Sequence, residues 1–214
     1  MTFLNRLLSP PQPQAAAFSP YADALMSGLA SGSGMSVTPD TALKISTVWA
    51  CVGLIADCVG MLPTLMYRYL GDGGRERATS HPLYDVLRDQ PNARQTAFEF
   101  KQMLTGHLLL RGNAYAKIVP GPRGFADQLV PVHPDQVTVL TNDGNVVYLI
   151  NGKRFNDEDI LHLRGLSTDG VNGMSVVSYA RESFGLALAG ERAGAKTFGN
   201  GSRPSGVLRT ASKL

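Results

Sequence analysis

The sequence has 214 residues, which is enough for one large domain or two small ones. Its 43% hydrophobic and 17% charged content is typical of a globular chain with a core, and no apolar run approaches the roughly 18 residues of a membrane span. Residues 1–8 hold one arginine and an apolar run too short for a secretory signal. The net charge of +3 is uneven, because residues 175–214 carry six basic and two acidic side chains. This excess hints at an acidic or polyanionic partner.

Residues 1–40 are expected to form a flexible N-terminal arm. Three prolines lie close together near the start, and the run SGLASGSGMS follows. A segment this rich in proline, glycine and serine buries too little surface to fold alone. The apolar side chains within residues 3–8 leave a second interpretation open, in which a short helix docks on a partner.

A helix is expected from Asp40 or Thr41 to about Val59, ended by Gly60 and Pro63. Apolar side chains at helical spacing predict its buried stripe: Leu43, Val48, Cys51, Leu54, Ile55 and Cys58. The two cysteines are two turns apart, about 10 Å along the axis, which is too far for a disulfide. They are interpreted as core thiols in a reducing compartment.

The middle of the chain reads as short helices followed by strands. Residues 62–69 alternate like a strand, GDGG makes a turn, and Pro82 begins a short helix to about Arg88. A capping box at Thr96 and Glu99 begins a helix that Gly112 ends. Five alternating runs then predict an antiparallel meander with turns at GPRG, NDG and NG: residues 114–119, 125–132, 136–140, 146–150 and 160–163.

One long helix is expected from Ser175, as N-cap, to Phe198, with Gly199 and Gly201 beyond its end. Its apolar stripe is Val177, Ala180, Phe184, Leu188, Ala195 and Phe198. Small residues in its second half suggest packing against copies of itself, although a helix lying on its own domain fits equally well. Helices, a meander and a final helix make an α+β plan.

No set of residues indicates catalysis. The sequence lacks a phosphate-binding loop, and its four histidines lack metal-ligand spacing. Asp157, Glu158 and Asp159 fit a solvated loop better than a metal site, because three adjacent acids do not share a face. Gly170 and Gly173 suit a flexible joint better than an anion site at a helix start. No basic surface with interleaved aromatics is visible for nucleic acid. We therefore expect no enzyme activity, no metal and no cofactor.

Six blocks occur in one order: STVWACVGLIADCVGMLPTLMYRY, HPLYDVLRDQPN, TAFEFKQMLTGHLLLRGNAYAKIV, LVPVHPDQV, DILHLRGLSTDGVNGMS and FGNGSRPSGVL. Together they resemble the portal proteins of tailed bacteriophages, in the family named after phage HK97, over about Thr41–Leu208. The resemblance implies a ring, usually dodecameric, at one capsid vertex, with double-stranded DNA passing through its channel during packaging and ejection. It implies roles in capsid assembly and a position in the virion, with host cytoplasm as the place of assembly.

The resemblance also divides the chain. Residues 41–173 correspond to the wing, 174–202 to the stem helix and 203–214 to the beginning of the clip. Candidate channel-facing or inter-subunit residues of the stem are Arg181, Glu182, Glu191, Arg192 and Lys196, and candidate terminase-side residues of the clip are Arg203 and Arg209. The implied partners are further copies of the chain, the major capsid protein, the terminase large subunit, head-completion or adaptor proteins and passing double-stranded DNA, with no membrane.

Chains of this family continue through the rest of the clip, a second stem helix and a helix at the channel constriction. This sequence stops one strand into the clip and is therefore expected to be truncated. Two alternatives stay open: a truncated portal fragment that does not assemble, and a non-catalytic DNA-binding module. A phage enzyme fused to such a domain would need a carboxylate cluster or a nucleophile with its base, and neither stands out.

Overall fold

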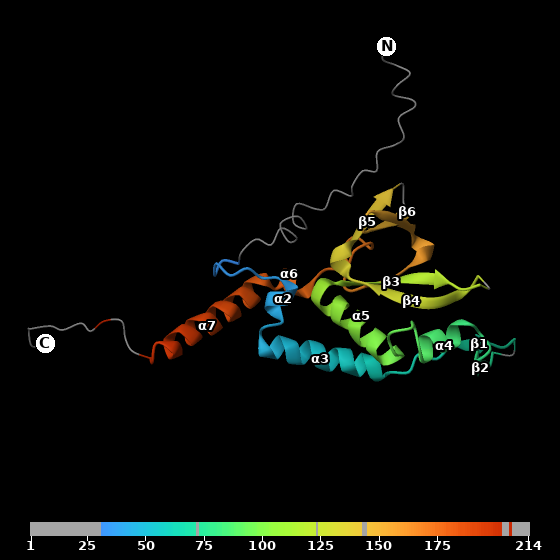
Figure 1. Cartoon of the computed structure of the whole chain (residues 1–214), viewed down its shortest axis with the longest axis horizontal. Coiled ribbons are helices and arrows are strands. Elements are labelled where there is room, and N and C mark those ends of the chain that lie inside the picture. Colours follow the sequence, from blue (N-terminus) through green and yellow to red (C-terminus); the bar gives the residue numbers. More distant parts are fainter. Residues whose placement is uncertain (1–30, 72, 123, 143–144, 203–205, 207–214) are drawn as a thin grey trace, which may run out of the picture.

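The computed structural model describes residues 31–71, 73–122, 124–142, 145–202 and 206. In this part of the chain, helices and two three-stranded sheets form a body, and the final helix, α7 (Arg181–Gly199), projects away from it (Figure 1). The expected α+β plan is confirmed. Residues 1–30, most of the expected flexible arm, lie outside the described residues. The last residues of that arm do not follow the expectation, because Val37 is buried against α7.

The first expected helix is two helices. The short α2 (Pro39–Ala42) begins at a capping box between Thr38 and Thr41, and three residues separate its end from α3 (Ser46–Met61). The predicted stripe is right only at its beginning, where Leu43 and Val48 are half-buried against a core cluster. The rest is wrong, because its other four residues are exposed: Cys51, Leu54, Ile55 and Cys58. The two cysteines are therefore not core thiols.

Small residues explain why α3 turns its other face inward. Its buried residues are Ala56 and Gly60, and a Cβ atom at Gly60 would lie 3.0 Å from the ring of Phe98 on α5 (Ala97–Arg111). Ala56 and Gly60 let the two helices approach closely, whereas the larger side chains on the opposite face would hold them apart. Because α3 is apolar nearly all round, its periodicity could not single out this face.

Helix α5 has the ends that the sequence predicts. The Thr96 hydroxyl accepts from the Glu99 amide while the Glu99 carboxylate accepts from the Thr96 amide, which forms the expected capping box. Gly112 ends the helix in the left-handed conformation, with φ of 77°. The short helix α4 (Leu83–Arg88) also lies where it is expected.

The strands form two sheets and a hairpin, not one meander. One sheet has the order β4 (Ala126–Val132), β3 (Asn113–Pro120), β8 (Ile160–Arg164), because β8 returns to pair with β3. The other is a meander of β5 (Val137–Asn142), β6 (Asn145–Ile150) and β7 (Lys153–Asn156). A hairpin of β1 (Tyr67–Tyr69) and β2 (Arg75–Arg77) follows α3. Strands β2 and β7 were not predicted from the sequence, because both are short and largely polar.

Strand β3 lies at the centre of the body. Ala114 and Ala116 face α5 in a core cluster with Phe100 and Leu104, while Tyr115 between them packs with Tyr148 of the second sheet. Successive side chains of a strand point to opposite faces, so β3 is buried on both sides. Short 3-10 turns, η2 (Pro134–Gln136) and η3 (Asp157–Asp159), connect the sheets.

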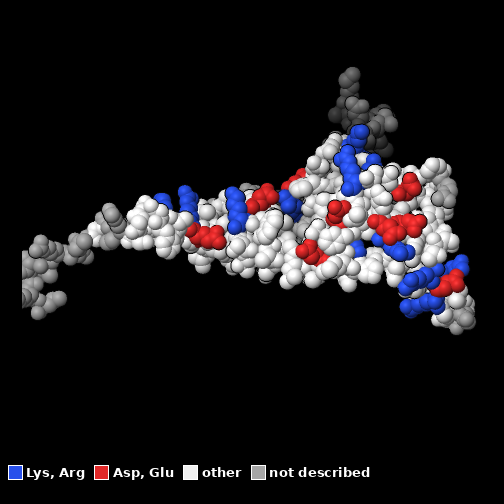
Figure 2. Space-filling model, turned by 60° about the horizontal axis from the view of Figure 1, so that its bottom comes forward, with Lys and Arg blue, Asp and Glu red and all other residues white. Residues whose placement is uncertain are grey.

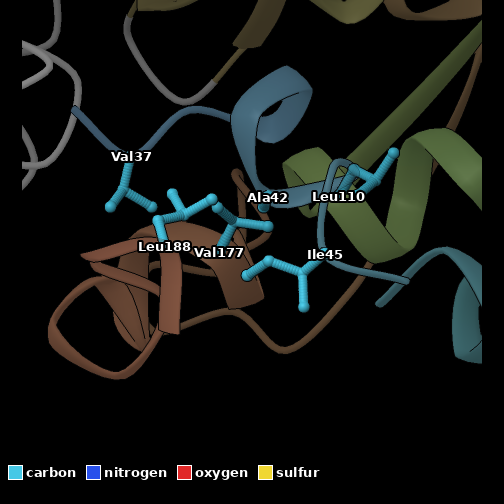
Figure 3. Packing of buried hydrophobic residues seen from close by; sticks show 6 residues of the cluster. All are labelled: Val37, Ala42, Ile45, Leu110, Val177 and Leu188. Atoms are coloured by element: carbon cyan, nitrogen blue, oxygen red, sulfur yellow. The ribbon is translucent and has the colours of Figure 1, made fainter. Parts of the chain in front are cut away.

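A third core cluster lies where α7 leaves the body. Figure 3 shows its six buried side chains, which come from the residues before α2, from α2 and the link after it, from α5, from α6 (Val176–Tyr179) and from α7: Val37, Ala42, Ile45, Leu110, Val177 and Leu188. The expected single long helix is broken at Ala180, between α6 and α7, where ψ is 25°. Ser175 caps α6 as predicted, and Gly201 lies beyond the end of α7 at φ of 70°.

Candidate functional site

The projecting helix α7 is supported over its first turns only. Gly185 and Leu188 are buried, whereas most residues after Leu188 are exposed, including Phe198 at 77%. At about 1.5 Å per residue, its 19 residues span roughly 28 Å. Most helical stability in proteins comes from packing of one face, so the free half of α7 offers a surface for a partner.

The strap, which we define as residues Ser31–Val37, holds the beginning of α7. The Gly32 amide donates to both carboxylate oxygens of Glu182, at 2.9 and 3.2 Å. Gly185 lies directly below the strap, because a Cβ atom there would overlap the Ser31 hydroxyl. Val37 packs against Leu188 in the same cluster. Glu182 therefore makes a contact within the chain.

The other predicted stem residues lie in different surroundings. Arg181 is half-buried at the start of α7, whereas Glu191, Arg192 and Lys196 are exposed on its free half. A guanidinium nitrogen of Arg192 lies 3.9 Å from the sulfur of Met35 in the strap. Figure 2 shows acidic and basic side chains of both signs along this helix. Arg203 and Arg209 lie outside the described residues, so no clip site can be placed.

Three glycines let segments of the chain cross closely between the end of β8 and the beginning of α6. We call this crossing of Gly112, Gly165 and Gly173 the joint. Gly112 ends α5, Gly165 follows β8 and Gly173 precedes α6; the Gly165 amide donates to the Gly112 carbonyl at 2.8 Å. A Cβ atom at Gly173 would overlap that same carbonyl oxygen and lie 2.7 Å from the Gly165 nitrogen. Gly173 is thus a position of close packing, not of flexibility. Gly170, at φ of 73° with open space around it, is a turn residue.

The side chain of Asn113 stabilises the joint by two hydrogen bonds to the backbone of Gly173. Its side-chain oxygen accepts from the Gly173 amide at 2.7 Å, and its amide nitrogen donates to the Gly173 carbonyl at 2.9 Å. Nε2 of His162 lies 3.0 Å from the same Asn113 oxygen and donates to it. Ser175 adds a bond from its hydroxyl to the Leu110 carbonyl at 2.7 Å. Since the Gly173 amide is already bonded, this helix start is not arranged as an anion site.

His162 is a structural member of the joint. Its ring stacks on Tyr115 with centroids 4.4 Å apart, and its Nδ1 lies 3.2 Å from the Tyr148 hydroxyl. Burial lowers the pKa of His162 to about 4, helped by the nearby Arg164 guanidinium, so the ring is neutral at pH 7. Burial also raises the pKa of Tyr148 to about 12.

The other titratable groups with close neighbours include a histidine pair and an arginine–aspartate pair. His107 and His133 have ring centroids 5.2 Å apart, while Arg111 donates to both Asp135 oxygens at 2.7 and 2.9 Å. Among the described residues, no three His, Cys, Asp or Glu side chains are grouped so as to hold a metal ion, and no helix is long and apolar enough to cross a membrane. The three acids of η3 are exposed, which confirms the solvated loop.

Two surfaces of the protein were not predicted from the sequence. One face of the β1–β2 hairpin carries Tyr67 and Tyr69 opposite Arg77 and Arg75, with the Arg75 guanidinium 4.9 Å from the centroid of the Tyr69 ring. This is a small basic surface with interleaved aromatics, and Figure 2 shows basic side chains gathered at the end of the body away from α7. The GDGG turn followed by RER was the available signal. The second surface is the exposed apolar face of α3.

Known proteins match over most of the chain. The sequence model of the family described as phage portal protein matches residues 46–214. The portal protein of Enterobacteria phage HK97 is 32% identical, and the probable portal protein of Streptomyces phage phiC31 is 34% identical. The alignments cover 84% and 91% of this chain but 43% and 46% of the relatives, so the chain spans less than half of these curated relatives.

Solved structures agree on the fold. A chain in the neck of an empty GTA particle with C6 symmetry superposes with a TM-score of 0.61 at 27% identity, covering 76% of this chain and 48% of that one. An HK97 family phage portal protein from Corynebacterium diphtheriae has a TM-score of 0.55 at 22% identity, covering 74% and 49%. The body with its projecting helix is thus a portal-like α+β fold, and the chain belongs to the phage portal protein family.

Proposed function

We propose that this protein is a subunit of a phage portal, the ring at one capsid vertex through which double-stranded DNA is packaged and ejected. The observation that carries the proposal is the projection of α7 from an α+β body, in a chain whose family match runs through both parts. In a ring of identical subunits, such a helix can form the wall of the opening while the bodies form the rim. The first turns of α7 are fixed to the body by the strap and the joint.

The chemistry of α7 suits passage of DNA without tight binding. Its charged residues are of both signs, with Arg181, Arg192 and Lys196 against Glu182 and Glu191. Sequence-independent affinity for DNA rises with the number of phosphates that a protein neutralises. A wall with few net positive charges per subunit therefore lets the duplex slide. Contacts of this kind are made to phosphates, whereas sequence is read by contacts to base edges.

The location and partners follow from the same proposal. Neck structures similar to this chain were computed with C6 and with C12 symmetry, which supports a ring of copies in a particle. We place the protein at a capsid vertex of the virion, after assembly in host cytoplasm, as a homo-oligomer of twelve. Its other partners are the major capsid protein, the terminase large subunit and head-completion proteins. The role is structural, without catalysis or a cofactor.

Electron microscopy of the purified full-length protein tests the proposal. Light scattering gives the molar mass of the particles in solution. At protein concentrations where this mass is that of an oligomer, we expect closed rings with a central opening. A protein that stays monomeric at every concentration and binds duplex DNA with steeply salt-dependent affinity would instead be a DNA-binding module.

A further inference from the structure

Helix α3 faces solvent with its apolar side. Thr47, Cys51, Leu54, Cys58 and Met61 are exposed at alternating steps of four and three residues, and Ile55 and Leu62 flank them. We call these seven residues the α3 surface. Steps of four and three repeat every 3.5 residues on average, as in the contact seams between packed helices. Leu54 is 67% exposed, Met61 66% and Leu62 63%.

The charge distribution on α3 is the reverse of that on an ordinary surface helix. Its one charged residue, Asp57, is turned toward the body, where its carboxylate accepts from the side chain of Gln102 on α5. The α3 surface itself carries no charge. Figure 2 shows this part of the molecule as largely uncharged between α7 and the basic end of the body. Interface cores are depleted of charged residues in the same way.

The size of the α3 surface also fits an interface. The exposed apolar side chains amount to roughly 400 Å², within the range of about 300–600 Å² for the largest patch on a monomer, which is often a functional surface. A standard interface buries about 800 Å² on each partner, so the α3 surface would supply about half of one side.

We infer that the α3 surface is a contact between neighbouring copies of this chain. The inference rests on the proposed function, which makes a second copy the constant neighbour of every subunit. A ring contact is heterologous, so the surface meets a different part of the next subunit. An uncharged helix face of this size is suited to such a permanent neighbour.

The two cysteines of the chain report on this contact without any labelling mutation. Both Cys51 and Cys58 belong to the α3 surface and are exposed in the single subunit. N-ethylmaleimide modification of the full-length protein, followed by mass spectrometry of the α3 peptide, is measured in dilute and in assembled samples. We expect the modification rate of both thiols to fall about tenfold or more on assembly, because a covered thiol is not attacked.

Leu54→Glu is the matched variant, with Leu166→Glu as its control. Leu166 is 80% exposed and lies outside the α3 surface, and both changes place the same charge on an exposed leucine. In dilute solution, the Leu54→Glu variant should have the wild-type melting temperature. At higher concentration it should not assemble, and both of its thiols should stay reactive. The Leu166→Glu variant should assemble and protect its thiols as the wild type does.

Three results would overturn the inference. If closed rings form while both thiols stay fully reactive, the α3 surface is not a contact between copies, although the portal proposal stands. Protection that is independent of concentration would show that the same chain covers the α3 surface. Absence of any assembly would count against the portal proposal and the inference together.

Discussion

At the scale of single residues, His162 is held by hydrogen bonds and by a stacked ring in the interior of the body. It donates to Asn113, contacts the Tyr148 hydroxyl and stacks on Tyr115, so it connects both sheets with the loop that leads into α6. This arrangement requires a neutral ring, because a charged imidazole would have to be held away from water beside Arg164.

Acid should therefore destabilise the protein before its carboxylates titrate. The pKa of His162 falls from 6.5 to about 4 on folding, so between these values the unfolded chain binds a proton that the folded chain does not. The free energy of unfolding then decreases as pH falls from about 6.5 to about 4, and His107, with a pKa also near 4, acts in the same direction.

Urea unfolding across this pH range, by circular dichroism, checks the expectation. His162→Gln removes one of the two titrations, so its free energy of unfolding should change less with pH than that of the wild type. His107→Gln, which removes the other titration, should reduce the slope as well. An unchanged slope in His162→Gln would show that His162 binds its proton equally well in both states.

At the scale of elements, the sequence predicted helices by their ends better than by their faces. Ser175, Thr96 and Gly112 are found at the helix ends where they were expected, because capping is local chemistry. The face of α3 could not be predicted, since it depends on the close approach of α5 to Ala56 and Gly60, which is a tertiary contact that the periodicity of α3 does not show. The return of β8 to β3 is equally non-local.

The candidate site was predictable in the same uneven way. The charged residues of α7 could be named from their spacing, and Glu191, Arg192 and Lys196 are exposed on the helix as expected. The role of Glu182 could not be predicted, because its hydrogen-bond partner Gly32 is 150 positions away in sequence. Asn113 and His162 carried no local signal, since their bonds join segments that are 49 positions apart.

Two glycines of α7 should respond in opposite directions to the same change. Gly185→Ala should destabilise the protein by about 1–3 kcal/mol, because its new methyl group would overlap the strap at Ser31. Gly190→Ala should stabilise it by about 0.5–1 kcal/mol, because no atom lies within 4 Å of the new methyl and alanine favours the helix.

Thermal melting of both variants in dilute solution measures this difference. If Gly185→Ala also raised the melting temperature, the strap would not rest on α7 as described.

At the scale of the whole molecule, the protein is a body with one projecting helix whose free half contacts little of its own chain (Figure 1). The uncharged α3 surface is a second feature of the kind that marks an interaction site, because large exposed apolar patches on monomers are often functional. Both are accounted for if the subunit works as one of many in a ring, with α7 along the opening and α3 against a neighbour.

The position of α7 in an assembled ring tests this account most directly. Cryo-electron microscopy of the full-length protein should show the helix of residues 181–199 surrounding the central opening, with the two sheets farther from the axis. A ring in which α7 lies on the outer rim, with the sheets around the opening, would contradict the account.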